Sequence, residues 1–359
     1  MRIAFYSSLI LATIILNGQI PVYEYVSFNK SLSVPESINS ERSAVIFDIP
    51  DKNGEFKQLG DYKKMLSQVH KGFVTMGIDA VFYLNHQDLV ASNSSFNSYV
   101  ELFNRRKVKF LIFITKNNTG YALAMSAFNG NRKMIESNAD VFYLEGTDLF
   151  SILLNMGKEI RRADYPLNNF LIPEKPNYLQ GLSTVENTLL KNYPGQLRRS
   201  ILAVERFALL DSTKTLDSKV LAKIKAYNKN IFKKNMELEK IMTAYPYEYV
   251  LIDPMSDDEL KRNRYQFLLR SVHSSARSVR QMLDYDVLPS ETGFVSIIPI
   301  MPDQTKVKTI PSDALVYKFY VRQNISKNVH VGEWDADVTW QSALKNMIGN
   351  LTQKLNIKN

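Results

Sequence analysis

Three short apolar runs in the first half of the chain predict strands that are buried on both faces. They are rich in β-branched and aromatic residues and comprise Ala44–Phe47, Ala80–Leu84 and Phe110–Ile114. Continuous apolar runs of this length are typical of strands that helices cover on both sides. Apolar residues recur at helical spacing between them, over Leu59–Met76 and Phe96–Phe103. This alternation predicts a largely parallel sheet with helices packed on it.

The first half is predicted to end with antiparallel strands and a helix. Asn117–Gly120 has the composition of a turn, so Tyr121–Phe128 is expected to run back beside the preceding strand. Val141–Leu144 predicts a further strand. Apolar residues on one face then predict an amphipathic helix over Leu149–Ile160.

The second half repeats this order of elements. Residues 164–195 hold four of the thirteen prolines, and we interpret them as a linker with one short helix near Leu179–Leu190. A capping box of Ser256 and Glu259 predicts the start of a helix that carries apolar residues as far as Leu283. The other predicted strands are Phe207–Leu210, Tyr249–Ile252, Phe294–Ile300, Leu315–Val321 and Val329–Val331, and the other predicted helices are Val220–Met242 and Trp340–Leu355.

The sequence therefore predicts an α/β protein of two tandem domains, each a mixed, mostly parallel sheet with packed helices. We place the domains at residues 43–163 and 196–359, because a chain of 359 residues exceeds the usual size of one domain. Both halves end in a strand, an Asn-containing turn, a return strand and an amphipathic helix. This shared order suggests an ancient duplication.

The N-terminus has the pattern of a signal peptide. Arg2 gives a short positive start, an uncharged apolar run extends to Leu16, and Gly18 offers a small residue for cleavage. The run is short for a membrane span, which needs about 20 apolar residues, but retention as an uncleaved anchor is the alternative. We expect cleavage after Gly18, export to the periplasm or the extracellular space, and an N-terminal extension over 19–42 with a short edge strand at Val22–Phe28.

Charge and composition narrow the chemistry. The net charge is +9, one less once Arg2 is removed, and this favours anionic partners such as phosphates, lipid head groups or polysaccharides. The basic residues are spread along the chain, so solvated helix faces are the alternative interpretation. The absence of cysteine excludes disulfides, Cys-ligated metals and thiol nucleophiles. Glycine-rich phosphate loops and metal-binding His pairs are also missing, so we predict no cofactor and no metal.

One group of polar residues has the composition of a catalytic site. Asp48, Asp51, His86 and Asp88 follow the ends of two predicted strands, with Asn85 and Lys116 also at strand ends. In open α/β sheets, sites form at the carboxyl ends of strands. Carboxylates there could act as a general base and the histidine as a proton shuttle. The simpler alternative is that these side chains cap helices and turns.

Two predicted helices carry many basic residues and are the candidate binding surfaces. The residues we select are Lys223, Lys233 and Lys234 on the first helix and Arg262, Arg270 and Arg277 on the second. Nucleic acid is not expected as a partner of an exported protein that lacks interleaved aromatics on one basic surface. We instead expect another envelope protein or an anionic polymer.

Taken together, the sequence favours an exported, non-catalytic binding or assembly protein of the cell envelope or the extracellular space. One alternative is an exported hydrolase or transferase that uses the Asp/His group at the strand ends. Another is a protein that binds an anionic glycan or lipid surface through its basic helices.

Overall fold

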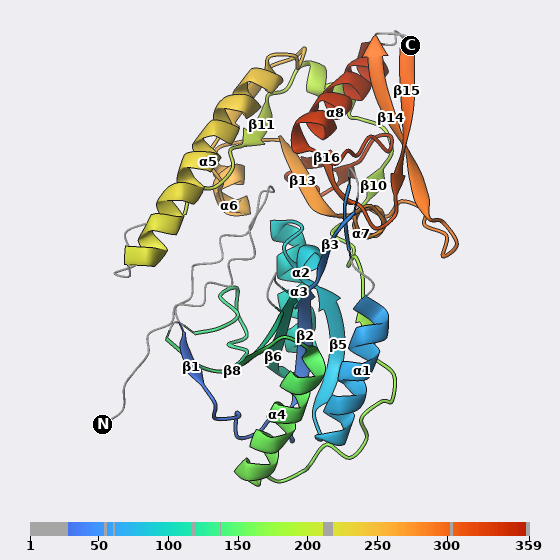
Figure 1. Ribbon diagram of the computed structural model, residues 1–359. Coiled ribbons are helices and arrows are strands. Elements are labelled where there is room, and N and C mark those ends of the chain that lie inside the picture. Colours follow the sequence, from blue (N-terminus) through green and yellow to red (C-terminus); the bar gives the residue numbers. More distant parts are fainter. Residues whose placement is uncertain are drawn as a thin grey trace. The chain divides into compact units, whose positions relative to one another are not determined.

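A computed structural model describes residues 28–53, 56–59, 62–116, 120–136, 138–210, 218–301 and 304–356. These residues form two compact units that follow one another along the chain (Figure 1). The units meet in the sequence at Gln180 and Gly181, inside the segment predicted as a linker, although residues 90–95 group with the second unit. The predicted signal peptide and the edge strand predicted before Phe28 lie outside the described residues.

The first unit contains a seven-stranded mixed sheet in the order β1-β8-β7-β6-β2-β5-β9. Its strands are β1 (Asn29–Ser31), β2 (Arg42–Asp48), β5 (Asp79–Asn85), β6 (Val108–Lys116), β7 (Tyr121–Ala127), β8 (Asp140–Gly146) and β9 (Tyr178–Leu179). Strand β2 pairs in parallel with β5 and β6, whereas β7 is antiparallel to both β6 and β8. A separate hairpin joins β3 (Pro50–Asn53) to β4 (Phe56–Leu59).

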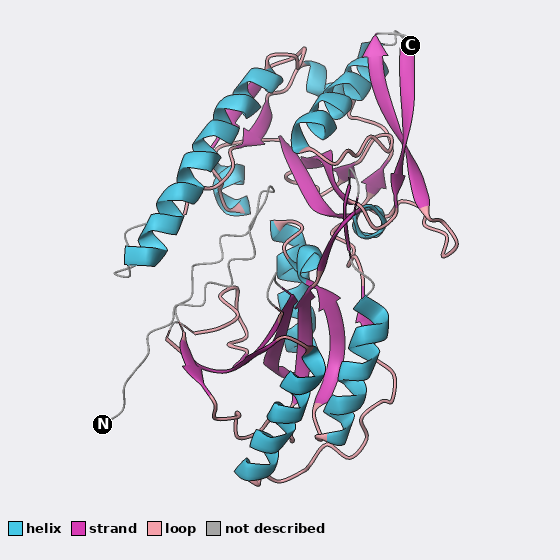
Figure 2. Cartoon of the chain, in the orientation of Figure 1, coloured by secondary structure: helices cyan, strands magenta, loops and turns pink. Residues whose placement is uncertain are grey.

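Helices cover both faces of this sheet (Figure 2). They are α1 (Tyr62–Thr75), α2 (His86–Leu89), α3 (Asn93–Arg105) and α4 (Leu149–Ala163). On one face α1 and α4 pack on a core that includes Val45 and Phe47. On the other face Phe103 of α3 stacks on Phe82 of β5, with ring centroids 6.5 Å apart. Burial from both sides is why β2, β5 and β6 each contain a continuous apolar run, as the sequence predicts.

The second unit contains a six-stranded mixed sheet in the order β10-β17-β16-β13-β11-β12. Its strands are β10 (Leu189–Leu190), β11 (Leu202–Glu205), β12 (Tyr249–Ile252), β13 (Phe267–Ser275), β16 (Leu315–Gln323) and β17 (Val329–His330). A two-stranded ribbon, β14 (Gly293–Met301) with β15 (Gln304–Pro311), stands apart from this sheet. The helices are α5 (Ser218–Met242), α6 (Asp257–Arg262), α7 (Ala276–Met282) and α8 (Trp340–Asn356), preceded by a 3₁₀ turn at Gly195–Arg198.

Helices α5 and α8 bury one face of the second sheet, and α6 covers part of the other. Phe267 and Leu269 of β13 lie in the core shared with α5 and α8. The intervening Leu268 packs instead with Leu260 of α6. Among the described residues, no helix combines the length and the apolar content needed to cross a membrane.

The two units have the same topology, which confirms the repeated α/β plan predicted from the sequence. Strand β11 pairs in parallel with β12 and β13, and β16 is antiparallel to β13 and β17. The edge strand β10 joins β17 in parallel, just as β1 joins β8. The order β1-β8-β7-β6-β2-β5 therefore corresponds to β10-β17-β16-β13-β11-β12. The Asn-containing turns that end both halves of the sequence therefore do not correspond, because the first joins β6 to β7, whereas the second joins β16 to β17.

The reason for this mismatch is β13, which the sequence analysis wrongly assigned to a long helix ending at Leu283. The capping box at Ser256 is present, but α6 ends at Arg262, and Arg264 adopts a left-handed conformation with φ 61°. Two further predictions are wrong. Phe207–Leu210 lies outside the strands, because the central strand is Leu202–Glu205, and the described residues near Leu179–Leu190 form the short strands β9 and β10 instead of a helix.

Candidate functional site

The strand-end group in the first unit is held by the neighbouring parallel strands β2 and β5. Asp48 is the last residue of β2, Asn85 is the last of β5, and His86 begins α2. Phe47 lies opposite Asn85, so Asp48 comes level with the start of α2. The side-chain Oδ1 of Asn85 accepts the backbone N–H of Gln87 at 2.7 Å, which fixes the turn from strand to helix.

Asp48 and His86 lie close enough for their charges to interact, as the sequence predicts for adjacent strand ends. Burial raises the pKa of the Asp48 carboxyl, and the nearby His86 partly offsets this. Burial likewise lowers the pKa of His86, and the Asp48 carboxylate partly opposes that shift. Both groups are thus pushed towards their neutral forms. The pair is therefore a poor source of charge for an incoming substrate.

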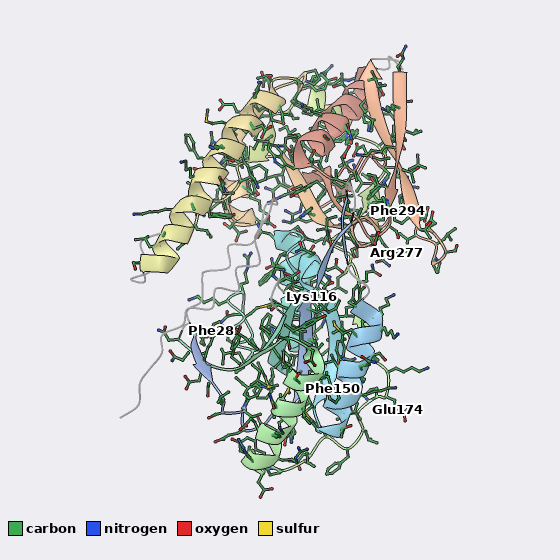
Figure 3. All side chains as sticks on the ribbon, in the orientation of Figure 1. Phe28, Lys116, Phe150, Glu174, Arg277 and Phe294 are labelled. Atoms are coloured by element: carbon green, nitrogen blue, oxygen red, sulfur yellow. The ribbon has the colours of Figure 1, made fainter. Side chains whose placement is uncertain are left out.

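The other strand-end candidates are scattered around this pair. Asp88 is buried in α2, and Asp51 lies in β3 with a side chain outside the described residues. Lys116 is exposed at the end of β6, where its ammonium lies 5.9 Å from the ring of Tyr121 (Figure 3). Throughout the described parts of the chain, no three His, Asp or Glu side chains are grouped to hold a metal. Asp48 and His86 are therefore the two predicted residues whose mutual influence the described structure shows.

We expect His86 to make the first unit less stable as the pH falls below about 6.5, the usual pKa of histidine. The unfolded chain then binds a proton that the folded chain excludes, so stability decreases towards acid. One such group changes the unfolding free energy by at most about 1.4 kcal/mol per pH unit. Urea unfolding of the natural chain and of His86→Gln between pH 7.5 and 5, followed by amide exchange in β2 and β5, measures this. Parallel pH profiles for the two proteins would contradict the assignment.

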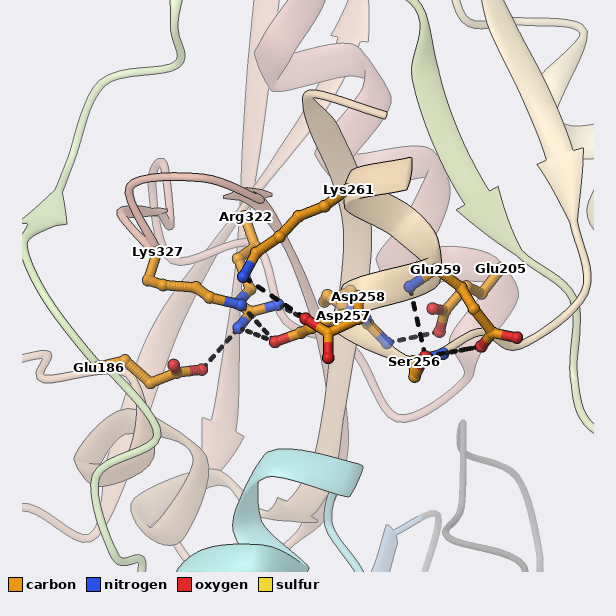
Figure 4. A network of polar contacts seen from close by, with 10 residues as sticks. Glu186, Glu205, Ser256, Asp257, Asp258, Glu259, Lys261, Arg322 and Lys327 are labelled. Atoms are coloured by element: carbon orange, nitrogen blue, oxygen red, sulfur yellow. Dashed lines mark hydrogen bonds and ion pairs between the residues drawn. The ribbon is translucent and has the colours of Figure 1, made fainter. Parts of the chain in front are cut away.

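A second charged group links the end of β11 and the start of α6 to β13 and β16 in the second unit (Figure 4). The guanidinium of Arg322 donates to both carboxylate oxygens of Asp257, at 2.9 and 3.0 Å, and to Oε1 of Glu186 at 2.7 Å. Lys327 also pairs with Asp257. Hydrogen bonds from Arg322, helped by those from Lys327, hold the pKa of Asp257 well below its usual range.

The charges of this group balance one another. Arg270 donates to Glu205 at 2.5 Å, so the predicted binding residue Arg270 is engaged inside the fold. Three cations, Arg270, Arg322 and Lys327, thus face the three carboxylates of Glu186, Glu205 and Asp257. Such a network orients β13, β16 and α6, and it leaves no excess charge for a ligand.

Arg277 is also turned towards the protein. Its guanidinium donates to the carbonyl oxygens of Leu288, at 3.1 Å, and Glu291. It lies 6.0 Å from the ring of Phe294 (Figure 3). By contrast, Arg262 is exposed at the end of α6. The basic residues that the sequence placed on one helix therefore occupy α6, β13 and α7 and do not share a surface.

Helix α5 presents a basic outer face, opposite the side that is buried in the core. Its exposed members, which we call the α5 face, are Lys225, Lys229, Phe232, Lys233, Met236 and Lys240. Phe232 and Met236 are 64% and 60% exposed and lie one helical turn apart. The exposed Glu237 and Glu239 border the α5 face, but none of the four lysines of this face forms an ion pair with the described carboxylates. Of the other predicted residues, the Lys223 side chain is outside the described ones. Lys234 is half-buried over Phe207, and burial lowers its pKa to about 8.

Two asparagines fix how α5 is rotated. The amide of Asn235 accepts from the backbone N–H of Phe207 and donates to its carbonyl, at 2.8 and 3.1 Å. Asn228 makes the same pair of bonds to Leu210, at 2.8 and 2.9 Å. The two amides stand seven residues apart on one flank of the helix, so they hold segment 207–210 along it. Leu209, in the segment that these amides hold, is a further exposed apolar side chain.

The fold and these surfaces define the class of the protein as a two-unit α/β protein with internally neutralised charge groups. Comparison with known proteins adds nothing to that class, since no family model and no curated protein matches the chain. Its function therefore has to be argued from its own residues.

Proposed function

We propose that this protein is a non-catalytic binding or assembly protein that is exported to the cell envelope or secreted. The supporting observation is the contrast between its charged groups. The carboxylates and cations of the network around Asp257 and Glu205 in the second unit pair with one another. The lysines of the α5 face have no such partners among the described residues. The α5 face is thus one exposed surface of the second unit on which several lysines remain available to a partner.

The α5 face favours an anionic lipid surface as the partner. From Lys225 to Lys240 it spans about 22 Å along the helix, at 1.5 Å per residue. A single helix face is convex, so it cannot enclose a small anion, but it can lay four lysines on a flat surface. Phe232 and Met236 between the lysines match the apolar part of a lipid interface. An anionic glycan has no such apolar phase, and we keep it as an outcome of the test.

Vesicle binding by the full chain tests this proposal. We expect the protein to bind vesicles of phosphatidylglycerol and phosphatidylcholine and to ignore vesicles of phosphatidylcholine alone. Binding should weaken between about 0.05 M and 0.5 M salt, because exposed charges are screened beyond a distance that shrinks with ionic strength. Equal binding to both vesicles, or binding only to an anionic polysaccharide, would exclude the lipid.

The enzyme alternative depends on the strand-end pair of the first unit. The half-buried Asp48 and the buried His86 supply the groups that a hydrolase or transferase would use. Asp48→Asn keeps the size of the side chain and removes its charge and basicity. We expect this variant to bind anionic vesicles as well as the natural chain does. Loss of the cellular function in Asp48→Asn, with vesicle binding intact, would favour the enzyme.

The export part of the proposal has its own test. We expect the protein recovered from cells to begin at Gln19, the residue that follows the proposed cleavage point. N-terminal sequencing or intact mass of the purified protein measures this directly. Recovery of a chain that keeps Arg2, in the cytosolic fraction, would contradict export.

A further inference from the structure

The ribbon of β14 and β15 is anchored to the second unit through β14. Phe294 is buried with its ring 6.2 Å from that of Trp334. The hydroxyl of Ser296 donates to the carbonyl of Ala336 at 2.6 Å. Gly349 of α8 lies so close to Pro299 that an added Cβ would come within 2.3 Å of its ring. These contacts hold β14 firmly and leave β15 as the outer strand of the ribbon.

The hydrogen-bond pattern shows which backbone groups of β15 face outwards. Ile297 of β14 donates its N–H to the carbonyl of Trp334, so it cannot exchange bonds with Val307 opposite. Facing residues in an antiparallel pair either exchange both bonds or neither, in alternation. The N–H and C=O groups of Thr305, Val307 and Thr309 therefore point to the open edge. No described strand pairs with that edge.

On the outer face of the ribbon, the side chains beside this edge are apolar or uncharged. Val295, Ile297, Thr305, Val307 and Thr309 share the outer face of the ribbon, since side chains alternate along each strand. Val295 and Val307 are 54% and 62% exposed. An open edge beside β-branched side chains is a template for another strand.

Lysine side chains often protect an open strand edge, but the two lysines of β15 do not lie on the outer face of the ribbon. Lys306 and Lys308 point to the opposite face of the ribbon, where Lys308 reaches the carboxylate of Asp337 at 3.0 Å. Pro311 ends the strand and lacks an N–H, so it limits the open edge to the residues before it. Lys306 is exposed and pairs with no described carboxylate.

We propose that β15 is a docking edge for an extended segment of a partner protein. The segment would have β-branched residues towards the outer face and acidic residues opposite Lys306 and Lys308. The backbone groups of Thr305, Val307 and Thr309 supply the hydrogen bonds, and the two lysines supply the charge preference. This inference deepens the proposed binding and assembly function by naming a surface distinct from the α5 face.

A second copy of this chain is a poorer occupant. Antiparallel pairing of β15 with itself about Val307 would set Lys306 of one copy opposite Lys308 of the other. Like charges directly opposite each other destabilise a strand pair. An acidic segment is instead attracted by the same two lysines. The charge pattern of the edge therefore favours an acidic partner over a second copy of this chain.

Two synthetic peptides test the docking edge on the full chain. The first is acetyl-Thr-Val-Glu-Val-Glu-Val-Thr-amide, and the second has lysine in place of both glutamates. We expect the Glu peptide to slow amide exchange at Thr305, Val307 and Thr309. It should bind about tenfold more tightly than the Lys peptide, as two cross-strand charge pairs allow. Lys306→Glu should remove most of this preference, because the new carboxylate opposes the contribution of Lys308.

Val307→Pro is the variant that separates edge pairing from simple charge attraction. It removes an N–H that points outwards and leaves the β14–β15 ladder intact, so it should abolish peptide binding. Val307→Thr is the matched control and should retain binding. Equal binding of both peptides, or unchanged binding by Val307→Pro, would overturn the proposal. A dimer lost in Val307→Pro would make a second copy the occupant. If neither peptide binds while vesicle binding persists, the docking edge is excluded and the proposed binding through the α5 face is retained.

Discussion

Replacing Asp335 with alanine is expected to lower the unfolding free energy of the second unit by about 3–5 kcal/mol, as for other buried ion pairs that lose one partner. Asp335 and Lys318 are both fully buried, with Nζ and Oδ1 2.6 Å apart. The ammonium of Lys318 also donates to the carbonyls of Phe319 and Val331, at 3.0 and 2.7 Å. Asn350 donates to the second carboxylate oxygen at 3.0 Å. The variant leaves a desolvated cation without its counter-ion.

Denaturant unfolding followed by amide exchange in β16 measures this loss. Glu333→Ala is the matched control, because Glu333 pairs with Lys354 in solvent and such pairs contribute about 0–1 kcal/mol. Burial lowers the pKa of Lys318, and Asp335 opposes this shift. In Asp335→Ala the opposition is gone, so the unfolded chain holds the lysine proton more strongly than the folded one. The loss should therefore shrink as the pH is raised towards 10. A cost no greater than that of Glu333→Ala would refute this account.

The sequence predicted the first sheet well because its strands are buried on both faces. Ala44–Phe47, for example, has no polar position. A continuous apolar run this short is typical of a buried strand, since helices are usually longer. The prediction from the sequence was wrong at β13, because the apolar residues Phe267, Leu268 and Leu269 fit the pattern of a helix as well as that of a strand. Only the two cores that lie on either side of this strand decide between them, and those cores are formed by α5, α6 and α8. Local pattern does not contain that information.

The same limit applies to the polar groups. Asp48 and His86 could be brought together from the sequence because the carboxyl ends of neighbouring parallel strands meet. Arg270 and Arg277 could not be placed correctly once β13 was assigned to a helix. The pair of Lys318 and Asp335 was missed. Its one signal is a lysine inside the apolar run Leu315–Val321, since a buried lysine needs a partner. Nothing in the sequence says that this partner is Asp335.

The α5 face could be predicted from the sequence only in part. The spacing of its lysines and the periodicity of α5 predict a solvated basic side. The exposure of Phe232 and Met236 depends on how the helix is rotated. That rotation is set by the amides of Asn228 and Asn235 on segment 207–210. A helix anchored in this way can keep large apolar side chains in solvent, which a freely packing helix would bury.

Changing all four lysines of the α5 face to glutamine is expected to weaken binding to anionic vesicles by about a thousandfold. Each lysine near an anionic surface contributes about 1 kcal/mol, and 1.4 kcal/mol corresponds to a factor of ten. The substituted residues are Lys225, Lys229, Lys233 and Lys240. A matched control removes four exposed cations elsewhere in the second unit, namely Lys191, Arg198, Arg199 and Lys345. Its net charge changes by the same amount, so it should keep most of the binding.

Phe232→Ser and Met236→Ser distinguish insertion from electrostatic adsorption on the same face. They leave the charge unchanged, so binding at low salt should fall only modestly. At high salt the lysines are screened, and the apolar side chains then provide most of the remaining affinity. The serine variants should therefore lose binding chiefly at high salt, measured by co-sedimentation over a salt series. If the variant without the four α5-face lysines and the matched control without four other cations lost the same affinity, net charge alone would attract the protein. Helix α5 would then have no special role.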